Sequence, residues 1–491
     1  MSWRPTRPLV PLVLSWALGC ASAPTPHNPA ATRPGSSSAA ETPASQRIDD
    51  YVGQFGRHWG EAFRFNGYVM VVRDGEVLYS NGFGRADAAG SPFEATTVFP
   101  IASNTKAFTA AAILKLQERQ KLSVEDRVVD HLPDYEGPAA EVTIHQLLTH
   151  TAGLPSYTTF PKYFETQSRE RSVEEILDLF RARPLLFSPG ESYTYSNSGY
   201  ALLGAIIEAA SGSSYGEFLA SEIIASAGLQ DTSFVPAGYC QDELPGYALG
   251  DDERLKLDDQ NTHMSNGFSA GGIRSTATDL AAWGTALLDG RVLQASSMEA
   301  LFTAEREHYA YGWEIGELAG QPLFWHGGVI CGFQNQVVLL PEEKLVVVAW
   351  INNRDFALDP LVPGVVSLAL GEEPLPVEEP ALVELSEAQR KRIAGQYQIT
   401  DQGRTAAIEA GAPETWIDTV SALTLVDRGG ELYVENLGGL LSATEDGPLV
   451  VRSWRVFFTF ERDDTDRITG MWMRQGDTSI EYDRAPAADE P

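Results

Sequence analysis

Apolar residues at the start of the folding region recur every three or four positions, which is the spacing of an amphipathic helix. The pattern then alternates over residues 67–73, turns at Asp74-Gly75 and resumes over residues 76–80, as in a β-hairpin. The residues that predict the helix are Ile48, Tyr51, Val52, Phe55, Trp59 and Phe63.

A second pair of apolar runs lies almost 300 residues later, at 336–340 and 345–351, on either side of Pro341-Glu342-Glu343-Lys344. The long stretch between the two pairs has mainly helical patterning. Strands at both ends of one segment predict an α+β domain over 47–371, in which N- and C-terminal strands close one antiparallel sheet flanked by helices.

Residues 372–384 are rich in proline and glutamate near their start, which favours a linker over a continued helix. Beyond them, residues 385–491 carry short apolar runs broken by glycine and aspartate. Regular short strands of this kind predict a small all-β domain, either a barrel or a sandwich.

The first 20 residues have the layout of an export signal, with two arginines ahead of an apolar stretch over residues 9–18. This stretch is too short to span a membrane. Ala17-Leu18-Gly19-Cys20 resembles a bacterial lipoprotein box, so we predict a lipidated Cys20 and an exported, membrane-anchored protein, with simple secretion as the alternative. Residues 21–46 are mostly Ala, Pro, Ser and Thr and predict a disordered tether.

A length of 491 residues agrees with more than one domain. The formal net charge of −31, from 67 acidic and 36 basic residues, argues against nucleic acid or an anionic membrane surface as the main partner. We therefore expect a soluble acidic surface rather than a site for cationic substrates.

Cysteine is sparse, with only Cys20, Cys240 and Cys331. Cys240 and Cys331 could pair in an oxidising compartment, but nothing in the sequence shows that they meet. We therefore favour an unpaired Cys331 that packs as a small buried hydrophobic residue.

The clearest candidate chemistry lies in Ser103-Asn104-Thr105-Lys106, at the start of an apolar run. In a helix this spacing puts Ser103 and Lys106 on one face. A serine needs a neighbouring base to become a nucleophile, and burial can lower the pKa of a lysine enough for it to serve. The run after Lys106 has almost no polar face, so we expect the helix to be enclosed and Lys106 to be desolvated.

Ser-x-x-Lys alone is a weak signal, but two further motifs follow in order, Tyr195-Ser196-Asn197 and His326-Gly327-Gly328. Together they resemble the penicillin-recognising serine hydrolases, which include class C β-lactamases, D-alanyl-D-alanine carboxypeptidases, D-aminopeptidases and related esterases. The segments 147–154, 198–204 and 270–280 also resemble stretches of that family, and residues 385–491 resemble the lipocalin-like β domains of some members.

The resemblance implies acyl transfer by Ser103 on an amide or ester, with a small molecule or peptide as substrate and no cofactor. Lys106 and Tyr195 are the candidate bases, and the sequence does not divide the work between them.

The other motif residues have implied supporting roles. Asn197 would hold Lys106 and substrate, and His326 would steady the Tyr195 hydroxyl or a substrate carboxylate. Gly327 and Gly328 would let the substrate approach the strand edge, and the N–H groups of Ser103 and Val329 would form the oxyanion hole.

One departure bears on the substrate. Histidine stands at position 326 where β-lactamases of this family carry lysine, and near neutral pH it is mostly uncharged. This puts efficient β-lactam hydrolysis in doubt and leaves D-amino-acid peptides, amides and esters open.

Three other interpretations of the sequence have weaker support. Gly267-Phe268-Ser269-Ala270-Gly271 matches the nucleophile elbow of α/β-hydrolases, but a polar stretch precedes it where a buried strand is needed. His145 and His150 lack further ligands in a metal-binding spacing, so no metal site is predicted. A non-catalytic envelope protein that captures peptidoglycan peptides or penicillin would retain the fold, but the intact motifs favour an enzyme.

Overall fold

The computed structural model describes most of the chain beyond the N-terminal segment. The predictions for residues 1–41, including Cys20, lie outside the described residues. These residues are 42–57, 64–87, 89–250, 255–303, 309–318, 320–356, 358–374, 381–409, 417–418, 420–435, 439–445, 447–451, 456–475 and 478–486.

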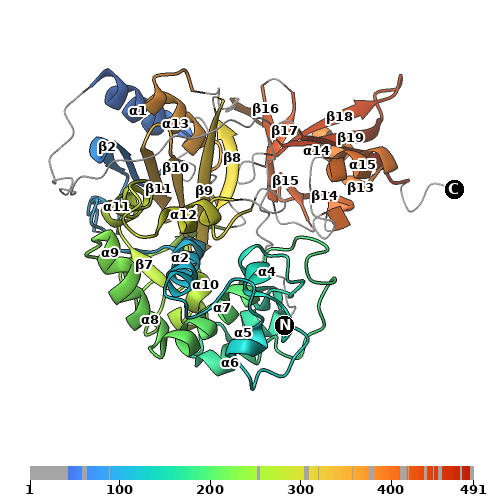
Figure 1. Ribbon diagram of the computed structural model, residues 1–491. Coiled ribbons are helices and arrows are strands. Elements are labelled where there is room, and N and C mark those ends of the chain that lie inside the picture. The colour runs from blue at the N-terminus through green and yellow to red at the C-terminus, as the bar shows by residue number, and fades with distance from the viewer. Residues whose placement is uncertain are drawn as a thin grey trace.

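A six-stranded antiparallel sheet forms the centre of the larger domain (Figure 1). The first strand pairs with the last one in register, Gly67 opposite Ile351 and Arg73 opposite Leu345, so the predicted closure of the sheet is confirmed. In spatial order the strands are β2 (Glu76–Phe83), β1 (Gly67–Arg73), β11 (Leu345–Ile351), β10 (Phe333–Leu340), β9 (Gln321–Ile330) and β8 (Glu314–Leu318).

Two helices cover one face of the sheet, α1 (Pro43–Gln54) and α13 (Leu361–Leu370). Thr42 caps α1 by accepting a hydrogen bond from Ser45 N, so the helix begins inside the last residues of the predicted tether. The helix also ends earlier than predicted, because Phe55 is extended and Gly56 has a φ of 70°.

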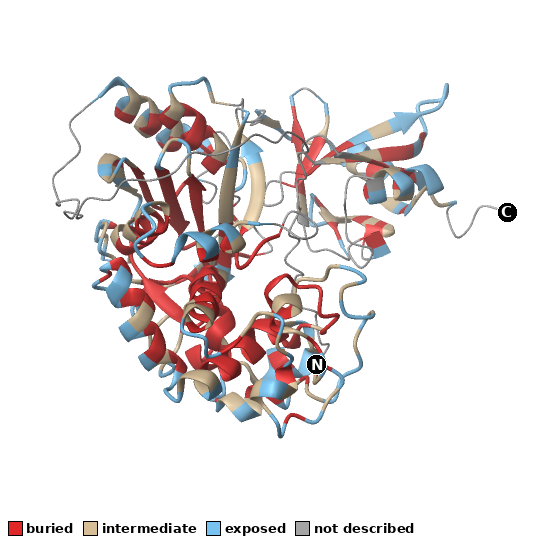
Figure 2. Cartoon of the chain, in the orientation of Figure 1, coloured by how far each residue is buried: buried red, intermediate tan, exposed pale blue. Residues whose placement is uncertain are grey.

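A larger helical layer covers the other face (Figure 1). It contains Ser103, Lys106 and Asn197, whereas the motif His326-Gly327-Gly328 lies on β9 of the sheet. At its centre lies α2, which is buried on nearly every side, as the apolar run predicted (Figure 2). The principal helices of this layer are α2 (Thr105–Glu118), α4 (Ile144–Leu148), α7 (Asn197–Ser211), α10 (Phe268–Gly271) and α11 (Ala277–Leu288).

The C-terminal domain is a closed eight-stranded antiparallel barrel, which decides between the two predicted all-β forms. It closes where β16 and β17, which are at the two ends of the spatial order of the barrel strands, pair Leu441 with Val451. Around the barrel the strands are β16 (Gly439–Thr444), β15 (Glu431–Val434), β14 (Ala422–Arg428), β13 (Gly395–Ile399), β20 (Thr478–Arg484), β19 (Ile468–Gln475), β18 (Val456–Arg462) and β17 (Leu449–Val451).

Two contacts join the barrel to its surroundings. The short strand β12 (Leu382–Val383) lies inside the predicted linker and pairs with β16, so the linker ends earlier than expected. Leu249, at the end of β5 (Tyr247–Leu249), packs on Val450 and Phe457 of the barrel.

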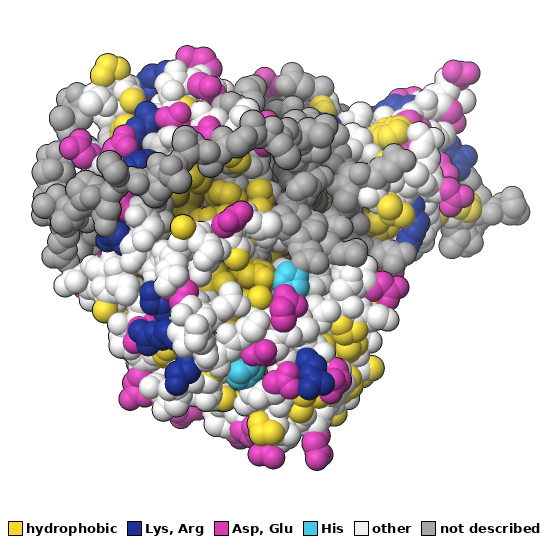
Figure 3. All heavy atoms as spheres, viewed as in Figure 1, with side chains coloured by type: hydrophobic (Ala, Val, Ile, Leu, Met, Phe, Trp, Pro, Cys, Tyr) yellow, Lys and Arg dark blue, Asp and Glu magenta, His cyan; other side chains and the backbone are white. Residues whose placement is uncertain are grey.

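Acidic side chains are scattered over the face shown in Figure 3 rather than gathered at one place. Among the helices that the structure describes, none combines the length and the apolar character needed to cross a membrane.

Candidate active site

Ser103 lies in a 3-10 turn, Ala102–Asn104, that runs directly into α2. Ala102 has a φ of 48°, a left-handed conformation that is uncommon for a residue with a side chain. Backbone strain of this kind persists only where the surroundings impose it, and it is frequent at functional sites. The turn therefore holds Ser103 in a position that its local sequence would not favour by itself.

Lys106 lies one helical turn after Ser103 and its side chain is fully buried. Its Nζ is 3.1 Å from Ser103 Oγ, 2.7 Å from Asn197 Oδ1 and 2.8 Å from the carbonyl oxygen of Ala270. The amine thus brings together residues from three parts of the chain at one point. Burial lowers the pKa of Lys106 well below its ordinary value, since the charged form loses its hydration.

Tyr195 approaches the same point from the segment before α7. The ring lies 4.8 Å from Lys106 Nζ, and the hydroxyl is hydrogen-bonded with the Ser103 side chain. Loss of solvent raises the pKa of Tyr195, although the bond with Ser103 opposes this. The phenol is therefore protonated near neutral pH and able to donate a hydrogen bond.

Asn197 is the first residue of α7, and its amide is held in one orientation. Nδ2 donates to Thr158 Oγ1 at 2.8 Å, which leaves Oδ1 to accept from Lys106. The backbone N–H of Asn197 donates to Ser156 Oγ. Thr158 and Ser156 belong to a loop in which the sequence offered no catalytic signal.

His326 is buried on β9, and its hydrogen-bond partners do not include the Tyr195 hydroxyl that was expected. Nδ1 lies 2.6 Å from the carbonyl oxygen of Gly327 and must donate to it. Nε2 is therefore an acceptor, and the Tyr309 hydroxyl, 3.0 Å away, donates a hydrogen bond to it. Burial, and secondarily the positive charge of Lys106, lowers the pKa of His326 to about 3. His326 is therefore neutral and bonded to Tyr309, not to Tyr195.

Gly328 also has a packing reason for being glycine, beside the predicted approach of substrate. A Cβ at this position would come within 2.2 Å of the Ile101 carbonyl oxygen and 2.8 Å of Asn335 Nδ2. The missing side chain therefore lets β9 pack against the turn that carries Ser103. A Cβ at Gly327 would meet only ordinary contacts, the nearest at 3.5 Å.

β9 extends beyond its pairing with β8. β8 pairs with β9 only over Gln321–Trp325, so this pairing does not reach Gly327 and Gly328. Val329, the next residue, is 38% exposed.

Two buried asparagines join the Ser103 turn to the sheet, and sequence analysis missed both. Asn104 Nδ2 donates to the carbonyl oxygen of His326 and to Asn335 Oδ1. Asn335 Nδ2 in turn donates to the carbonyl oxygen of Ile101. The position of Asn104 beside Ser103 was the only available signal, because Asn335 is remote in sequence and belongs to a strand that otherwise packs into the core.

Glu314, at the start of β8, brings a carboxyl group near the phenols. Burial raises the pKa of Tyr309 as it does that of Tyr195, and an ionised Glu314 would raise both further. Desolvation, together with the nearby Asp359 carboxyl, raises the pKa of Glu314 itself to about 8. Near neutral pH this carboxyl is mostly protonated.

The raised pKa of Glu314 predicts a pH dependence of stability. Between pH of about 4.5 and 8 the folded protein retains a proton that the unfolded chain has released, so this group makes the folded state less stable as pH rises through that window. Glu314→Gln should therefore lose less stability than wild type between pH 5.5 and 8.5. Thermal unfolding of both proteins at the two pH values measures the difference, and equal losses would contradict the assignment.

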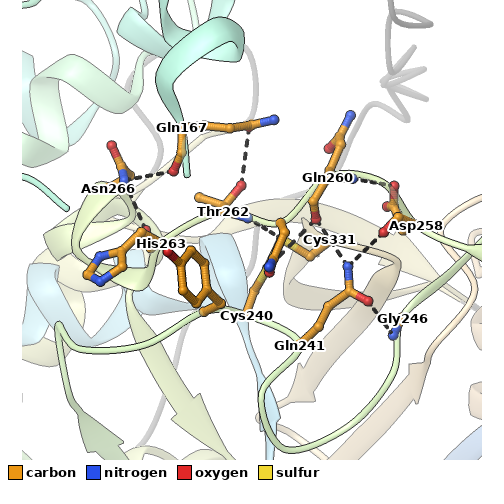
Figure 4. Close-up of a disulfide and its surroundings, with 12 residues drawn as sticks. Gln167, Cys240, Gln241, Gly246, Asp258, Gln260, Thr262, His263, Asn266 and Cys331 are labelled. Carbon is orange, nitrogen blue, oxygen red and sulfur yellow. Dashed lines mark hydrogen bonds between the residues drawn. A yellow bond between two sulfur atoms is a disulfide. The ribbon is translucent and has the colours of Figure 1, made fainter. Parts of the chain in front are cut away.

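The structure contradicts the prediction that Cys331 is unpaired, because Cys240 and Cys331 form a disulfide across 91 residues (Figure 4). Cys331 follows β9 directly, and the fold brings the loop around Gly246 against it. A Cβ at Gly246 would lie 1.9 Å from the Cys331 carbonyl oxygen, so this close approach needs glycine. Such long-range contact leaves no local trace in the sequence.

The alternative nucleophile, Ser269, is fully buried, and its Oγ donates to the carbonyl oxygen of Tyr200 at 2.8 Å. It lies on α10, and no nucleophile elbow between a strand and a helix is present around it.

Within the described ranges, no group of three or more His, Cys, Asp or Glu residues is placed to hold a metal ion.

Comparisons with known proteins agree with this geometry. Residues 53–363 match the family model described as Beta-lactamase. The chain is 32% identical over 318 residues to Penicillin-binding protein 4* of Bacillus subtilis, covering 60% of this chain and 70% of that one. It is 29% identical over 305 residues to Protein flp of Staphylococcus aureus, covering 58% of this chain and only 59% of that protein.

Solved structures with the same fold include a penicillin-binding protein homologue from Pyrococcus abyssi, described as octameric, with a TM-score of 0.60 and 21% identity over 89% of this chain and 99% of that chain. Another is D-amino acid amidase from Ochrobactrum anthropi, with a TM-score of 0.57 and 22% identity over 66% of this chain and 99% of that chain. The match to the Pyrococcus abyssi protein covers more of this chain than the larger domain contains, so it extends into the C-terminal region.

Proposed function

This chain belongs to the Beta-lactamase family, and from that premise we propose that it is a serine hydrolase that forms an acyl-enzyme on Ser103. The observation that carries the proposal is the set of contacts at Lys106. A neutral amine has two N–H donors and one lone pair. Asn197 Oδ1 and the Ala270 carbonyl oxygen accept the two donors, so the lone pair is left to accept a hydrogen bond from the Ser103 hydroxyl, whose Oγ is 3.1 Å from Nζ.

The reaction follows from these contacts. Ser103 Oγ forms a bond to the substrate carbonyl carbon as its proton passes to Lys106, and the carbonyl electron pair moves onto oxygen. The N–H groups of Ser103 and Val329 would stabilise this oxyanion. When the oxyanion collapses, the bond to the leaving group breaks, and Tyr195 gives that group a proton and regains one from Lys106. Water then releases the acyl group by the reverse sequence.

The substrate we propose is an amide or ester whose acyl part needs no fixed cation at position 326, because His326 is neutral and its ring nitrogens are bonded to Tyr309 and Gly327. Amides and esters of D-amino acids fit this requirement. The fold likeness to D-amino acid amidase from Ochrobactrum anthropi makes them the first compounds to assay. A carboxylate-bearing β-lactam fits less well, since a buried neutral histidine offers it no charge.

A non-catalytic envelope protein that captures penicillin or peptidoglycan peptides is the second candidate. It has support from the likeness to Penicillin-binding protein 4* of Bacillus subtilis. This candidate predicts binding or a stable adduct without turnover, so kinetics separate it from the hydrolase.

Intact mass measurement tests both candidates. The protein is incubated with a fluorophosphonate or a labelled penicillin, and the modified peptide is mapped. A hydrolase should gain one adduct on the peptide that contains Ser103, and it should turn over a D-amino-acid ester. The absence of any adduct would contradict the proposal, as would an adduct on Ser269.

We also propose that the protein is exported and anchored through Cys20. The basic and apolar layout of residues 1–20 supports export, and so does the Cys240–Cys331 disulfide, since such bonds persist in oxidising compartments. The mature protein should then begin at an acylated Cys20 and partition with membranes, and Cys20→Ala should block processing or give a soluble form. A mature N-terminus within residues 21–46 without acyl mass would leave simple secretion.

A further inference from the structure

His150 lies beside the site but has no part in the chemistry described so far. It follows α4 in a stretch, residues 147–154, that resembles the family without an assigned function. The side chain is buried, and the backbone has a φ of 59°, which is uncommon for histidine. The fold thus maintains an unfavourable backbone conformation at a residue that faces the candidate motifs.

Two hydrogen bonds join His150 to the chain on either side of Tyr195. The N–H of Thr194 donates to the His150 carbonyl oxygen at 3.0 Å, and the N–H of Ser196 donates to Nδ1 at 3.1 Å. The backbone before and after Tyr195 is therefore fixed by one residue. This constrains the direction in which the phenol leaves the chain.

The imidazole ring also packs on the phenols themselves. Its centroid lies 4.4 Å from that of Tyr195, 4.6 Å from that of Tyr309 and 5.1 Å from that of Tyr200. Tyr309 is the residue that donates to His326. His150 consequently contacts the second motif directly and the third motif through a single intermediate.

The protonation of His150 suits packing rather than proton transfer. Nδ1 accepts a backbone hydrogen bond, so a neutral ring carries its proton on Nε2, and Nε2 has no hydrogen-bond partner among the described residues. Burial lowers the pKa of His150 well below its ordinary value. A buried donor without a partner destabilises the folded state, so stability alone does not account for histidine here.

We propose that His150 is a positioning residue that sets the Tyr195 phenol in line with Ser103 for protonation of the leaving group. The proposal rests on the proposed function, because it assigns a role within that reaction. It distinguishes substrates by their leaving groups. An amine must receive a proton as it departs, whereas nitrophenolate departs without one, so misplacement of Tyr195 should slow amide cleavage far more than nitrophenyl ester cleavage.

Two substitutions separate the contributions of His150. His150→Gly suits the left-handed backbone and removes both the ring and the acceptor, while His150→Asn tolerates that backbone and keeps a side-chain oxygen for the Ser196 N–H. The matched control is His131→Asn. His131 is the last residue of α3 (Val128–His131), and its Nε2 contacts Asp126.

The assay compares kcat for a D-amino-acid nitroanilide or amide with kcat for the corresponding nitrophenyl ester. We expect amide turnover to fall about 100-fold in His150→Gly and about tenfold in His150→Asn, with ester turnover changed by no more than about threefold. KM should change little, and the control should keep the wild-type ratio. Tyr195→Phe should show the same selective loss, and the double variant with His150→Gly should lose little more than Tyr195→Phe alone.

A fall of amide and ester turnover by the same factor would overturn the proposal, because a general loosening of the site has that effect. An unchanged ratio in His150→Gly would also overturn it, and if that variant does not fold, an unchanged ratio in folded His150→Asn decides in the same way. If neither substrate acylates the wild-type protein, the proposed function would instead be refuted.

Discussion

Ser103→Ala should abolish covalent labelling by a fluorophosphonate and reduce hydrolysis of an activated ester by about 10³-fold or more, the scale expected when the nucleophile of a coupled catalytic group is lost. The substitution removes one hydroxyl from a turn whose backbone is held by Asn104 and Asn335. We therefore expect the thermal unfolding temperature to change little. Loss of activity without loss of folding would identify chemistry rather than packing as the cause.

Ser269→Ala is the matched control. Ser269 Oγ donates to the Tyr200 carbonyl oxygen in the core, so its removal should cost about 1 kcal/mol of stability while labelling persists. Labelling that survives in Ser103→Ala and disappears in Ser269→Ala would identify Ser269 as the nucleophile and contradict the role proposed for Ser103.

Lys106→Ala should reduce kcat/KM for the ester by about 10²–10⁴-fold, the usual contribution of a general base. The reason is the opposite effect of burial on two neighbours. It lowers the pKa of Lys106, which favours the neutral amine, and raises that of Tyr195, which disfavours the phenolate. Of the two candidate bases, burial therefore favours the proton-accepting form in Lys106 and disfavours it in Tyr195.

The pH profile provides the specific measurement. In wild type, kcat/KM should rise with pH through the lowered pKa of Lys106 as the amine loses its proton, and this limb should be absent from the residual activity of Lys106→Ala. A small primary amine added to the variant should restore part of the rate, since the substitution vacates space between Ser103, Asn197 and Ala270. If Tyr195→Phe lost ester hydrolysis and Lys106→Ala retained it, the phenol would be the base.

The same geometry changes the expected consequence of histidine at position 326. From sequence, His326 is a candidate for contact with a substrate carboxylate, and lysine there would add a useful charge. In the structure the ring is buried and both ring nitrogens are hydrogen-bonded, so a lysine at position 326 would place a buried ammonium near Lys106 and lose both hydrogen bonds of the histidine. We therefore expect His326→Lys to destabilise the site rather than to improve turnover of β-lactams.

The amino-acid sequence by itself determined the architecture of the sheet and the location of the motifs. Nearly continuous apolar runs define β1 and β11 at the bounds predicted for them, because a short run of this kind suits a strand that is buried on both faces. The same is true of the enclosed helix after Ser103, where a continuous apolar run leaves no face for water. Burial of Lys106 follows directly from that run.

Only the tertiary structure decided which groups meet. The bond of His326 to Tyr309, the link of Asn104 to Asn335 and the Cys240–Cys331 disulfide all join residues far apart in sequence. Their contact depends on how β9, its neighbours and the loops pack, and packing satisfies buried polar groups with whichever partners the fold brings near. The closure of the barrel has the same origin, since one added strand pairing separates a barrel from a sandwich and no local pattern records it.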